Sequence, residues 1–184
     1  MKNSEAILVT PKQFEIQECP VPEPKDHEIL MKVEYVGMCG SDIHGFEFGP
    51  FIPPKDPNQK IGLGHEVAGE VVKVGSKVTR FKAGDKVLIE PGVPDDKCEY
   101  CRTGRYNICP DVDFMATQPN YKGALTQYMT HPEEWTYHIP EGTNLHISFI
   151  VPVGRILSVI FPAAFPIRDT LSILVQIVCL AALC

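Results

Sequence analysis

Three cysteines and one aspartate lie close together in the sequence, at the spacing of a zinc-binding loop. Asp95, Cys98, Cys101 and Cys109 follow one another at increments of three, three and eight residues. Two-residue gaps let consecutive ligands turn back onto one ion, and thiolate sulfurs at about 2.3 Å from zinc suit a closed tetrahedral site. Asp95 is a harder ligand than a thiolate and could equally be a solvated loop residue. The spacing predicts a structural zinc site, with an empty lobe of free thiols as the alternative.

A second group of possible ligands lies in two glycine-rich segments. A catalytic zinc ion takes about three protein ligands and keeps one position open for water or substrate. Cys39, His65 and Glu66 supply such a set, and Ser41 lies two residues after the thiol, where its hydroxyl could reach a substrate oxygen. From spacing alone, a buried cysteine and a hydrogen-bonded histidine are the commoner interpretation of such residues.

Composition restricts the partners and the compartment. The chain has 184 residues, with 17 Lys and Arg against 23 Asp and Glu, a formal net charge of −6. No basic excess is available to hold a phosphate backbone, so nucleic acid is not expected as a partner. There are seven cysteines, and we find no secretory signal at the start of the sequence. We therefore expect a reducing, cytoplasmic location, where clustered cysteines are more often ligands than disulfides.

The elements that must position these ligands are short strands. Runs of β-branched or alternating apolar residues occupy residues 6–9, 14–16, 29–36, 67–74 and 86–90. The 17 prolines and 14 glycines between and around them exclude long helices. The pattern predicts a mostly β barrel or sandwich with long loops, and the ligands should lie on those loops.

The last forty residues, 145–184, have a different composition. They contain 27 apolar residues and only three charges, Arg155, Arg168 and Asp169. The final run of 14 nearly all apolar residues is shorter than the roughly 20 that a membrane-spanning helix needs. We interpret this tail, whose structure the pattern leaves open, as a hydrophobic segment without a native partner or a buried helix. Membrane contact through residues 147–184, by an interfacial or spanning segment, is the alternative.

A dinucleotide-binding turn is not found in the sequence. Gly62, Gly64 and Val67 partly imitate one, but a strand pattern follows them where an amphipathic helix is required. We therefore expect no Rossmann domain in this chain.

With both ligand groups in view, the sequence resembles the medium-chain zinc-dependent alcohol and polyol dehydrogenases, most closely the sorbitol/xylitol (L-iditol 2-) dehydrogenase branch. The resemblance covers roughly residues 4 to 144. It rests on the segments VGMCGSDIH (36–44), GHEVAG (64–69), GDKV (84–87), IEPGVP (89–94), GRYNICPD (104–111), FMATQP (114–119) and GAL (123–125).

The resemblance implies the fold and its cofactors. A GroES-like (co-chaperonin-like) β-barrel catalytic domain is expected over residues 1–144, with a zinc lobe at about 91–112. The family also has a separate NAD(P)-binding domain, and its full-length members form homo-oligomers. Zinc is the expected catalytic ion and also the structural one.

The resemblance also implies roles for individual residues. Cys39 and His65 would bind the catalytic zinc, and Glu66 would bind it directly or through water. Ser41 and His44 match the hydroxyl and proton-relay positions. Asp42 matches a residue that orients a ligand histidine through a hydrogen bond. Phe114 aligns with a residue that lines the polyol pocket.

The implied reaction is metal-assisted hydride transfer, in which a small polyol loses a hydride to a nicotinamide and a secondary alcohol becomes a ketone. Two departures from the family pattern bear on it. Asp95 replaces the first of four lobe cysteines found in many relatives. After Asn144 the family continues with a Glu-Pro segment and the cofactor domain, whereas here the apolar tail follows. We interpret the ending as truncated or altered, and a non-catalytic zinc-binding fragment, membrane-associated through its tail, is the alternative function.

Zinc-loaded chain mixed with sorbitol and NAD is expected to give no NADH absorbance above buffer. No strand–turn–helix unit is available to hold the pyrophosphate, and Pro152, Pro162 and Pro166 interrupt the region where one could form. Without a held nicotinamide, the reaction loses positioning that contributes roughly 7–11 kcal/mol of barrier reduction. Robust sorbitol-dependent turnover in a spectrophotometric assay would contradict this expectation.

Overall fold

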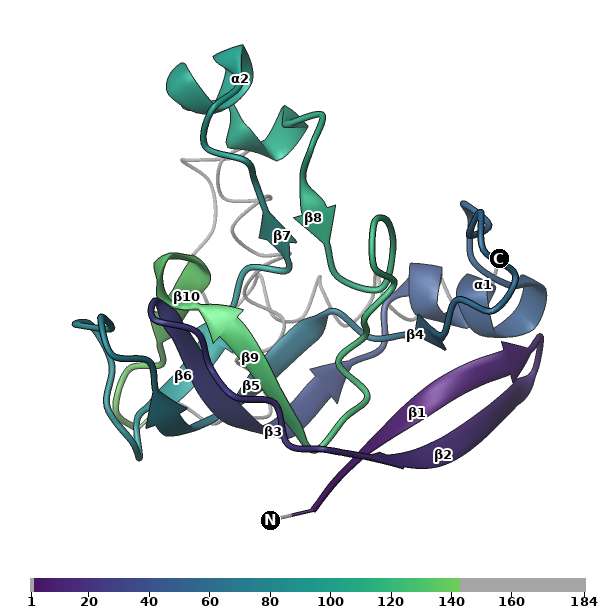
Figure 1. Cartoon of the computed structure of the whole chain (residues 1–184), viewed down its shortest axis with the longest axis horizontal. Helices are drawn as coiled ribbons and strands as arrows, with labels where there is room; N and C mark the ends of the chain where they lie inside the picture. Colours follow the sequence, from purple (N-terminus) through teal and green to yellow (C-terminus); the bar gives the residue numbers. More distant parts are fainter. Residues whose placement is uncertain (1, 143–184) are drawn as a thin grey trace.

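The computed structural model describes residues 2–142 (Figure 1). The expectations about the tail at 145–184 fall outside the described residues. The elements in chain order are β1 (Asn3–Thr10), β2 (Gln13–Cys19), β3 (Glu28–Gly37), α1 (Gly40–Phe48), β4 (Ile61–Gly62), β5 (Glu66–Val74), β6 (Lys86–Ile89), β7 (Gly92–Val93), α2 (Glu99–Arg102), η1 (Tyr106–Ile108), β8 (Asp113–Phe114), β9 (Tyr128–Pro132), η2 (Glu133–Trp135) and β10 (Thr136–His138).

The mostly β fold expected from the sequence is confirmed. Each of the five apolar runs named above falls on a strand, namely β1, β2, β3, β5 and β6. Helix α1 was not expected from the pattern. The sequence also did not predict β9 and β10, because both are short and neither has a clear alternation of apolar and polar residues.

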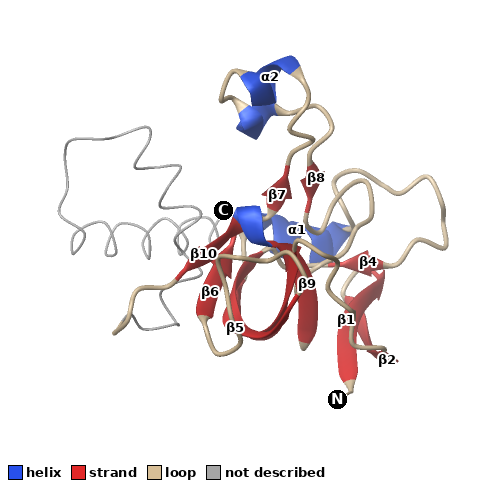
Figure 2. Ribbon diagram, turned by 60° about the vertical axis from the view of Figure 1, so that its left-hand side comes forward, coloured by secondary structure: helices blue, strands red, loops and turns tan. Residues whose placement is uncertain are grey.

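The strands form three antiparallel sheets, seen side by side in Figure 2. Their orders are β2-β1-β4, β10-β6-β5-β3-β9 and β7-β8. The five-stranded sheet is strongly curved. Its two edge strands, β9 and β10, are consecutive in the chain and are joined through η2. No strand pairing links β9 to β10 within residues 2–142.

The expectation of a closed barrel is therefore corrected to a curled sheet. The last residue of β9 is Pro132, which has no backbone N–H to offer to a neighbouring strand. The three residues of η2 turn the chain toward the other edge instead. There the backbone N–H of Glu90 donates to the carbonyl oxygen of Trp135 at 2.8 Å. The fold is closed by covalent connection and loop hydrogen bonds rather than by a continuous strand ladder.

The main core fills the inside of this curl. Its largest fully buried aliphatic side chains are Ile29, Met31, Val67, Val71, Val87 and Ile89. They come from β3, β5 and β6, the three central strands of the sheet. Burying one such side chain stabilises the fold by about 1.5–3 kcal/mol. These strands are thus the rigid part of the domain to which the loops are attached.

In the part of the chain that the structure describes, no helix has both the length and the apolar character needed to cross a membrane.

His131 is a titratable side chain enclosed in this core. It lies in β9 opposite Ile29 and is only 4% exposed. Burial lowers the pKa of His131 to about 4, although backbone carbonyls of Glu90 and Trp135 and the nearby Glu28 carboxylate favour the protonated ring. In the unfolded chain a histidine titrates near about 6.5. The folded state therefore holds His131 neutral at pH 7 and binds fewer protons than the unfolded state below that pH.

This difference makes the domain sensitive to acid. The contribution is fully present above about pH 6.5 and is lost as the pH falls toward 4, so the free energy of unfolding should drop by roughly 3 kcal/mol over that range. His131→Gln, which cannot titrate, should remove that part of the pH dependence. Urea denaturation at several pH values, followed by the fluorescence of the single tryptophan, measures the difference. Equal pH slopes for both proteins would contradict the assignment.

Candidate active site and zinc-binding lobe

Two loops that are distant in sequence meet at one end of the β3–β5 pair. The two strands run antiparallel, and the last residue of β3, Gly37, lies opposite the first residue of β5, Glu66. The residues that follow β3 and precede β5 are therefore brought together. Ligand atoms of Cys39, His65 and Glu66 all lie within 4.8 Å of one another. The structure thus assembles the three side chains that the sequence predicted as one group.

The carboxylate of Asp42 holds the two loops in place. Its Oδ2 accepts the backbone N–H of Cys39 at 3.0 Å, and its Oδ1 accepts the backbone N–H of Gly64 at 2.7 Å. Oδ1 also lies 3.5 Å from Nδ1 of His65. The side chain is only 2% exposed. Asp42 therefore contacts the backbone beside one predicted ligand and the ring of another.

The ionisation of Asp42 follows from these contacts. Burial opposes its charge, but the hydrogen bonds from His65 and from the two backbone N–H groups outweigh burial and hold the pKa of Asp42 below its ordinary value. A buried carboxylate is stable in this form because each of its oxygens has a donor.

Glycine is required at position 64 of this loop. Its φ angle is +86°, and a Cβ atom there would lie 2.8 Å from Cγ1 of Val36. Any other residue would be strained in that conformation and would displace the N–H that Asp42 accepts. The backbone conformation and the lack of space for a Cβ atom therefore explain the glycine next to His65.

Cys39 and His65 shift one another's ionisation. Burial disfavours the Cys39 thiolate, but hydrogen bonds from Ser41 and from His65 outweigh burial, and the pKa of Cys39 is lowered. Burial likewise disfavours the His65 imidazolium, but Asp42 and Cys39 together raise the pKa of His65 to about 9. Burial raises the pKa of Glu66, which His65 partly opposes. Thiolate, imidazole and carboxylate are the ligand types of catalytic zinc, and His65 must lose its proton to bind a metal ion.

The other predicted residues surround this group. Ser41 is exposed and hydrogen-bonds to Cys39. The ring of Phe114 lies beside His65, with centroids 5.7 Å apart and planes at 56°. His44 points elsewhere: its ring stacks on Phe51, and within residues 2–142 no hydrogen bond joins it to Ser41. The structure therefore brings Ser41 and Phe114 to the site and places His44 at its margin.

The lobe cysteines and Asp95 also converge. Sγ of Cys98 lies 3.4 Å from Sγ of Cys101 and 3.9 Å from Sγ of Cys109. Oδ1 of Asp95 lies 3.2 Å from the sulfur of Cys101 and 3.4 Å from that of Cys109. Tetrahedral zinc with bonds of about 2.3 Å places neighbouring sulfurs about 3.8 Å apart. The four donors therefore fit one tetrahedral zinc ion.

The electrostatics of the lobe also favour a cation. Backbone N–H groups of Lys97 and Cys98 donate to Oδ1 of Asp95 and hold its pKa far below the ordinary value. Burial and the neighbouring Cys98 and Asp95 raise the pKa of Cys101 to about 12. A thiolate at Cys101 is disfavoured beside the carboxylate of Asp95 unless a positive ion neutralises both charges. This donor set suits zinc, and Asp95 lies as close to the other donors as the thiols do.

Sequence reasoning missed two features of the site. Cys39 is the N-cap residue just before α1, and Asp42 is at the third helical position. Their spacing matches the pattern in which the side chain at the third position accepts the N-cap N–H. That pattern could have revealed α1. No local signal could have revealed the contact of Asp42 with Gly64, because 22 residues separate them.

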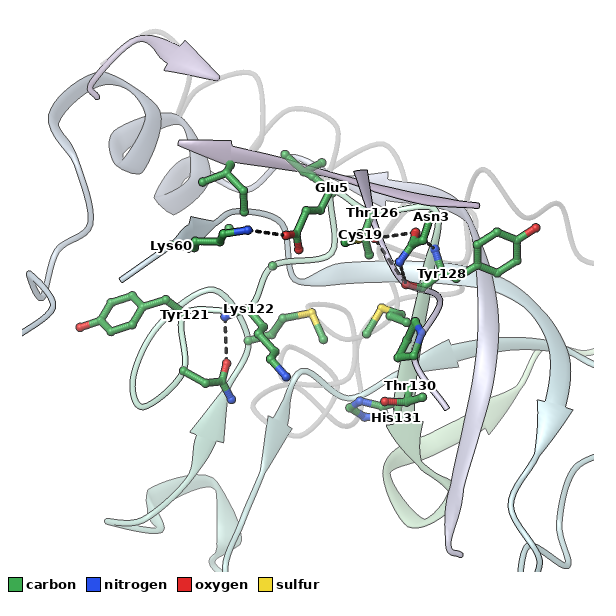
Figure 3. Close-up of a pocket in the computed structure, with 18 of the residues that line it drawn as sticks. Asn3, Glu5, Cys19, Lys60, Tyr121, Lys122, Thr126, Tyr128, Thr130 and His131 are labelled. Atoms are coloured by element: carbon green, nitrogen blue, oxygen red, sulfur yellow. Dashed lines mark hydrogen bonds and ion pairs between the residues drawn. The ribbon is translucent and has the colours of Figure 1, made fainter. Parts of the chain in front are cut away.

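A separate groove is lined by residues of β1, β8 and β9, among others (Figure 3). Phe114 faces His65, whereas the alternate residues Asp113 and Met115 line the groove. Its volume is about 1010 Å³. Many of its lining side chains are polar, including Asn3, Glu5, Lys60, Lys122, Thr130 and His131. Neither group of candidate metal ligands lines this groove.

Comparisons with known proteins agree with the expected resemblance. The model of the alcohol dehydrogenase GroES-like domain matches residues 25–141. The uncharacterized zinc-type alcohol dehydrogenase-like protein YdjJ of Escherichia coli (strain K12) is 67% identical over 144 residues, which make up 78% of this chain and 42% of that protein. Sorbitol dehydrogenase of Bacillus subtilis (strain 168) is 42% identical over 148 residues, 76% of this chain and 39% of that protein.

A solved structure has the same fold. It is an oxidoreductase/dehydrogenase of unknown specificity involved in membrane biogenesis from Escherichia coli. The TM-score is 0.80 at 64% sequence identity, covering 82% of this chain and 44% of that one. The chain thus spans less than half the length of the relatives it matches.

Asp42→Asn is expected to weaken zinc binding at the Cys39 group by about 10–100-fold, because the hydrogen-bond partner of a ligand histidine orients it and raises its basicity. The affinity can be measured by competition with a chromophoric chelator. A Cys101→Ala background removes the lobe site from the measurement.

Asp85→Asn is the matched control, since Asp85 also accepts a backbone N–H, that of Lys82, but outside the ligand group. Its zinc affinity should equal that of the background protein. Equal affinities for Asp42→Asn and the background would rule out the role given to Asp42.

Proposed function

The chain belongs to the alcohol dehydrogenase GroES-like domain family, and from this membership we propose that it is the catalytic-domain portion, residues 1–144, of a zinc-dependent, NAD(P)-linked polyol dehydrogenase. The reaction is the oxidation of a secondary alcohol to a ketone. The observation that carries the proposal is the convergence of Cys39, His65 and Glu66 within 4.8 Å on loops tied together by buried Asp42. The similarity to a sorbitol dehydrogenase supports a polyol as the substrate.

The thiolate of Cys39, the imidazole of His65 and the carboxylate of Glu66 would hold zinc. When bound, the ion supplies Lewis-acid chemistry that lowers the pKa of an alcohol. The chain's own residues orient the site. Asp42 fixes the ring of His65, and Phe114 beside that ring offers an apolar wall to the carbon chain of a polyol.

The proton released from the alcohol requires a path to solvent. Ser41 is exposed and already hydrogen-bonds at Cys39, so its hydroxyl can take part in a proton transfer next to the ligands. His44, three residues further along α1, is not hydrogen-bonded to Ser41 among the described residues, so the proton would reach it at the margin of the site by way of water. A nicotinamide, when bound, would supply the acceptor for the hydride on the carbon that bears the hydroxyl, so that the alcohol loses one proton and one hydride in all.

The lobe would hold a second, structural zinc ion through Asp95, Cys98, Cys101 and Cys109. Helix α2 has four residues and none of them is buried, so little core supports this part of the chain. A closed tetrahedral site contributes folding energy directly in such cases. The five cysteines among the described residues are all free, which suits a reducing cytoplasm.

Metal and substrate binding test the proposal on the chain as it stands. Zinc analysis should show two equivalents, and Cys39→Ala and Cys101→Ala should each lose one. In cobalt-substituted protein, sorbitol or xylitol should change the visible absorption spectrum. That change should vanish in Cys39→Ala and persist in Cys101→Ala, which alters only the lobe.

The alternative is a zinc-binding fragment without catalytic function. Two zinc equivalents with no spectral response to any polyol would favour this alternative. Unchanged zinc content in Cys39→Ala would remove the proposed catalytic metal site altogether.

A further inference from the structure

We propose that Gly92 is a positioning residue: it sets where the ring of Phe114 lies beside His65, and through that ring it sets the space left for the carbon chain of the substrate. This inference rests on the proposed function, in which Phe114 offers an apolar wall to a polyol. It deepens that function by naming the residue that determines which polyols fit. Gly92 itself belongs to neither group of candidate metal ligands.

Gly92 and Phe114 lie opposite one another in the short stem that leads into and out of the lobe (Figure 1). Strands β7 and β8 pair antiparallel there, and Gly92 is buried. Directly opposite residues of an antiparallel pair are close neighbours, with Cβ atoms about 4.5–5.5 Å apart. A side chain at position 92 would therefore lie beside that of Phe114.

The ring of Phe114 occupies part of the space that such a side chain would need. A Cβ atom at position 92 would lie 3.2 Å from Cδ2 and 3.7 Å from Cε2 of that ring, and 3.3 Å from Cγ2 of Val112. One edge of the ring thus packs against the glycine. The φ angle of Gly92 lies outside the left-handed region, so the backbone conformation does not itself require glycine. Lack of space explains the glycine in this strand.

The backbone around this contact is held in place on both strands. The N–H of Met115 donates to the carbonyl oxygen of Pro91 at 3.0 Å, and the ring of Pro91 fixes its own φ angle. On the other side of Phe114, Nδ2 of Asn120 donates to both carboxylate oxygens of Asp113, at 2.9 and 2.8 Å. A methyl group at position 92 would therefore be accommodated by a movement of the aromatic ring rather than by separation of the strands.

The same ring is the neighbour of His65, with centroids 5.7 Å apart and planes at 56°. A Cβ contact of 3.2 Å requires the neighbouring ring to give way by a few tenths of an ångström, which changes its place beside His65. Among the described glycines, Gly92 is the one whose Cβ would meet this ring. One methylene group in an apolar pocket can change discrimination between substrates by about tenfold or more. Residue 92 is therefore expected to affect how long a polyol fits.

The chemical shifts of the His65 ring protons test the proposal, because they depend on the position of the neighbouring aromatic ring. The signals are assigned in the zinc-loaded chain by their loss in His65→Gln. Gly92→Ala should shift them. In a Phe114→Leu background the same substitution should leave them in place, because that background has no ring to displace.

Gly40→Ala is the matched control. Gly40 lies next to Cys39, its φ angle is also outside the left-handed region, and a Cβ atom there would meet nothing within 4 Å. This variant should leave the His65 signals unchanged. Unchanged signals in Gly92→Ala would overturn the proposal, and so would equal shifts with and without the ring of Phe114. If Gly92→Ala alone does not fold, recovery of the fold in the double variant with Phe114→Leu supports the contact, and no recovery overturns it.

Polyol binding tests the consequence for specificity. In cobalt-substituted chain, the ratio of the dissociation constants for glycerol and sorbitol should change severalfold in Gly92→Ala and stay constant in Gly40→Ala. An unchanged ratio together with shifted His65 signals would overturn the role in specificity. The proton spectra require no substrate. Failure of the proposed function, seen as a wild-type chain without any spectral response to a polyol, is therefore distinguishable from failure of this inference.

Discussion

The buried carboxylate of Asp42 is the interaction on which the candidate active site depends. It ties the start of α1, where Cys39 lies, to the loop of Gly64 and His65, which reaches it from 22 residues away. Hydrogen bonds to a charged group contribute about 1.5–3 kcal/mol each, and a buried charge that loses its donors is costly. The same contacts that keep Asp42 ionised therefore resist any separation of the two loops. The geometry of the ligands is built into the fold through this one side chain.

The sheet provides the rigid base for that arrangement. The antiparallel register of β3 and β5 places Gly37 opposite Glu66, and the side chains inside the curl are fully buried. The close-packed interior fixes the positions of the two strands, and the residues attached directly to their ends are therefore held close to one another. The reactive groups thus lie on loops, while the precision of their placement comes from the core.

The two candidate metal centres differ in what supports them. The Cys39 group lies on the packed sheet and has Asp42 behind it. The lobe has no buried residue in α2 or η1, and its donors touch mainly one another. The shape of the lobe therefore depends on the interactions among its thiols and Asp95. A bound cation would offset the repulsion between their negative charges. A catalytic site needs an open position held by the fold, whereas a structural site is held by the ion itself.

Much of this organisation was readable in the sequence, because it depends on local patterns. The spacing of the cysteines predicted the lobe in which four donors lie together, and apolar runs predicted five strands. The types of Cys39, His65 and Glu66 predicted a group of side chains that the fold brings together. Helix α1 was readable in principle from the spacing of Cys39 and Asp42.

The tertiary structure decided the remainder. It showed that Asp42 joins two loops, that β9 and β10 are edges of a curled sheet rather than partners in a barrel, and that the rings of Phe51 and His44 stack. It also showed the groove lined by residues of β1, β8 and β9. Residue types and spacings constrain chemistry and local conformation, but contacts between distant segments are set by how the whole core packs. The packing depends on many segments of the chain at once, so it cannot be inferred from any one of them alone.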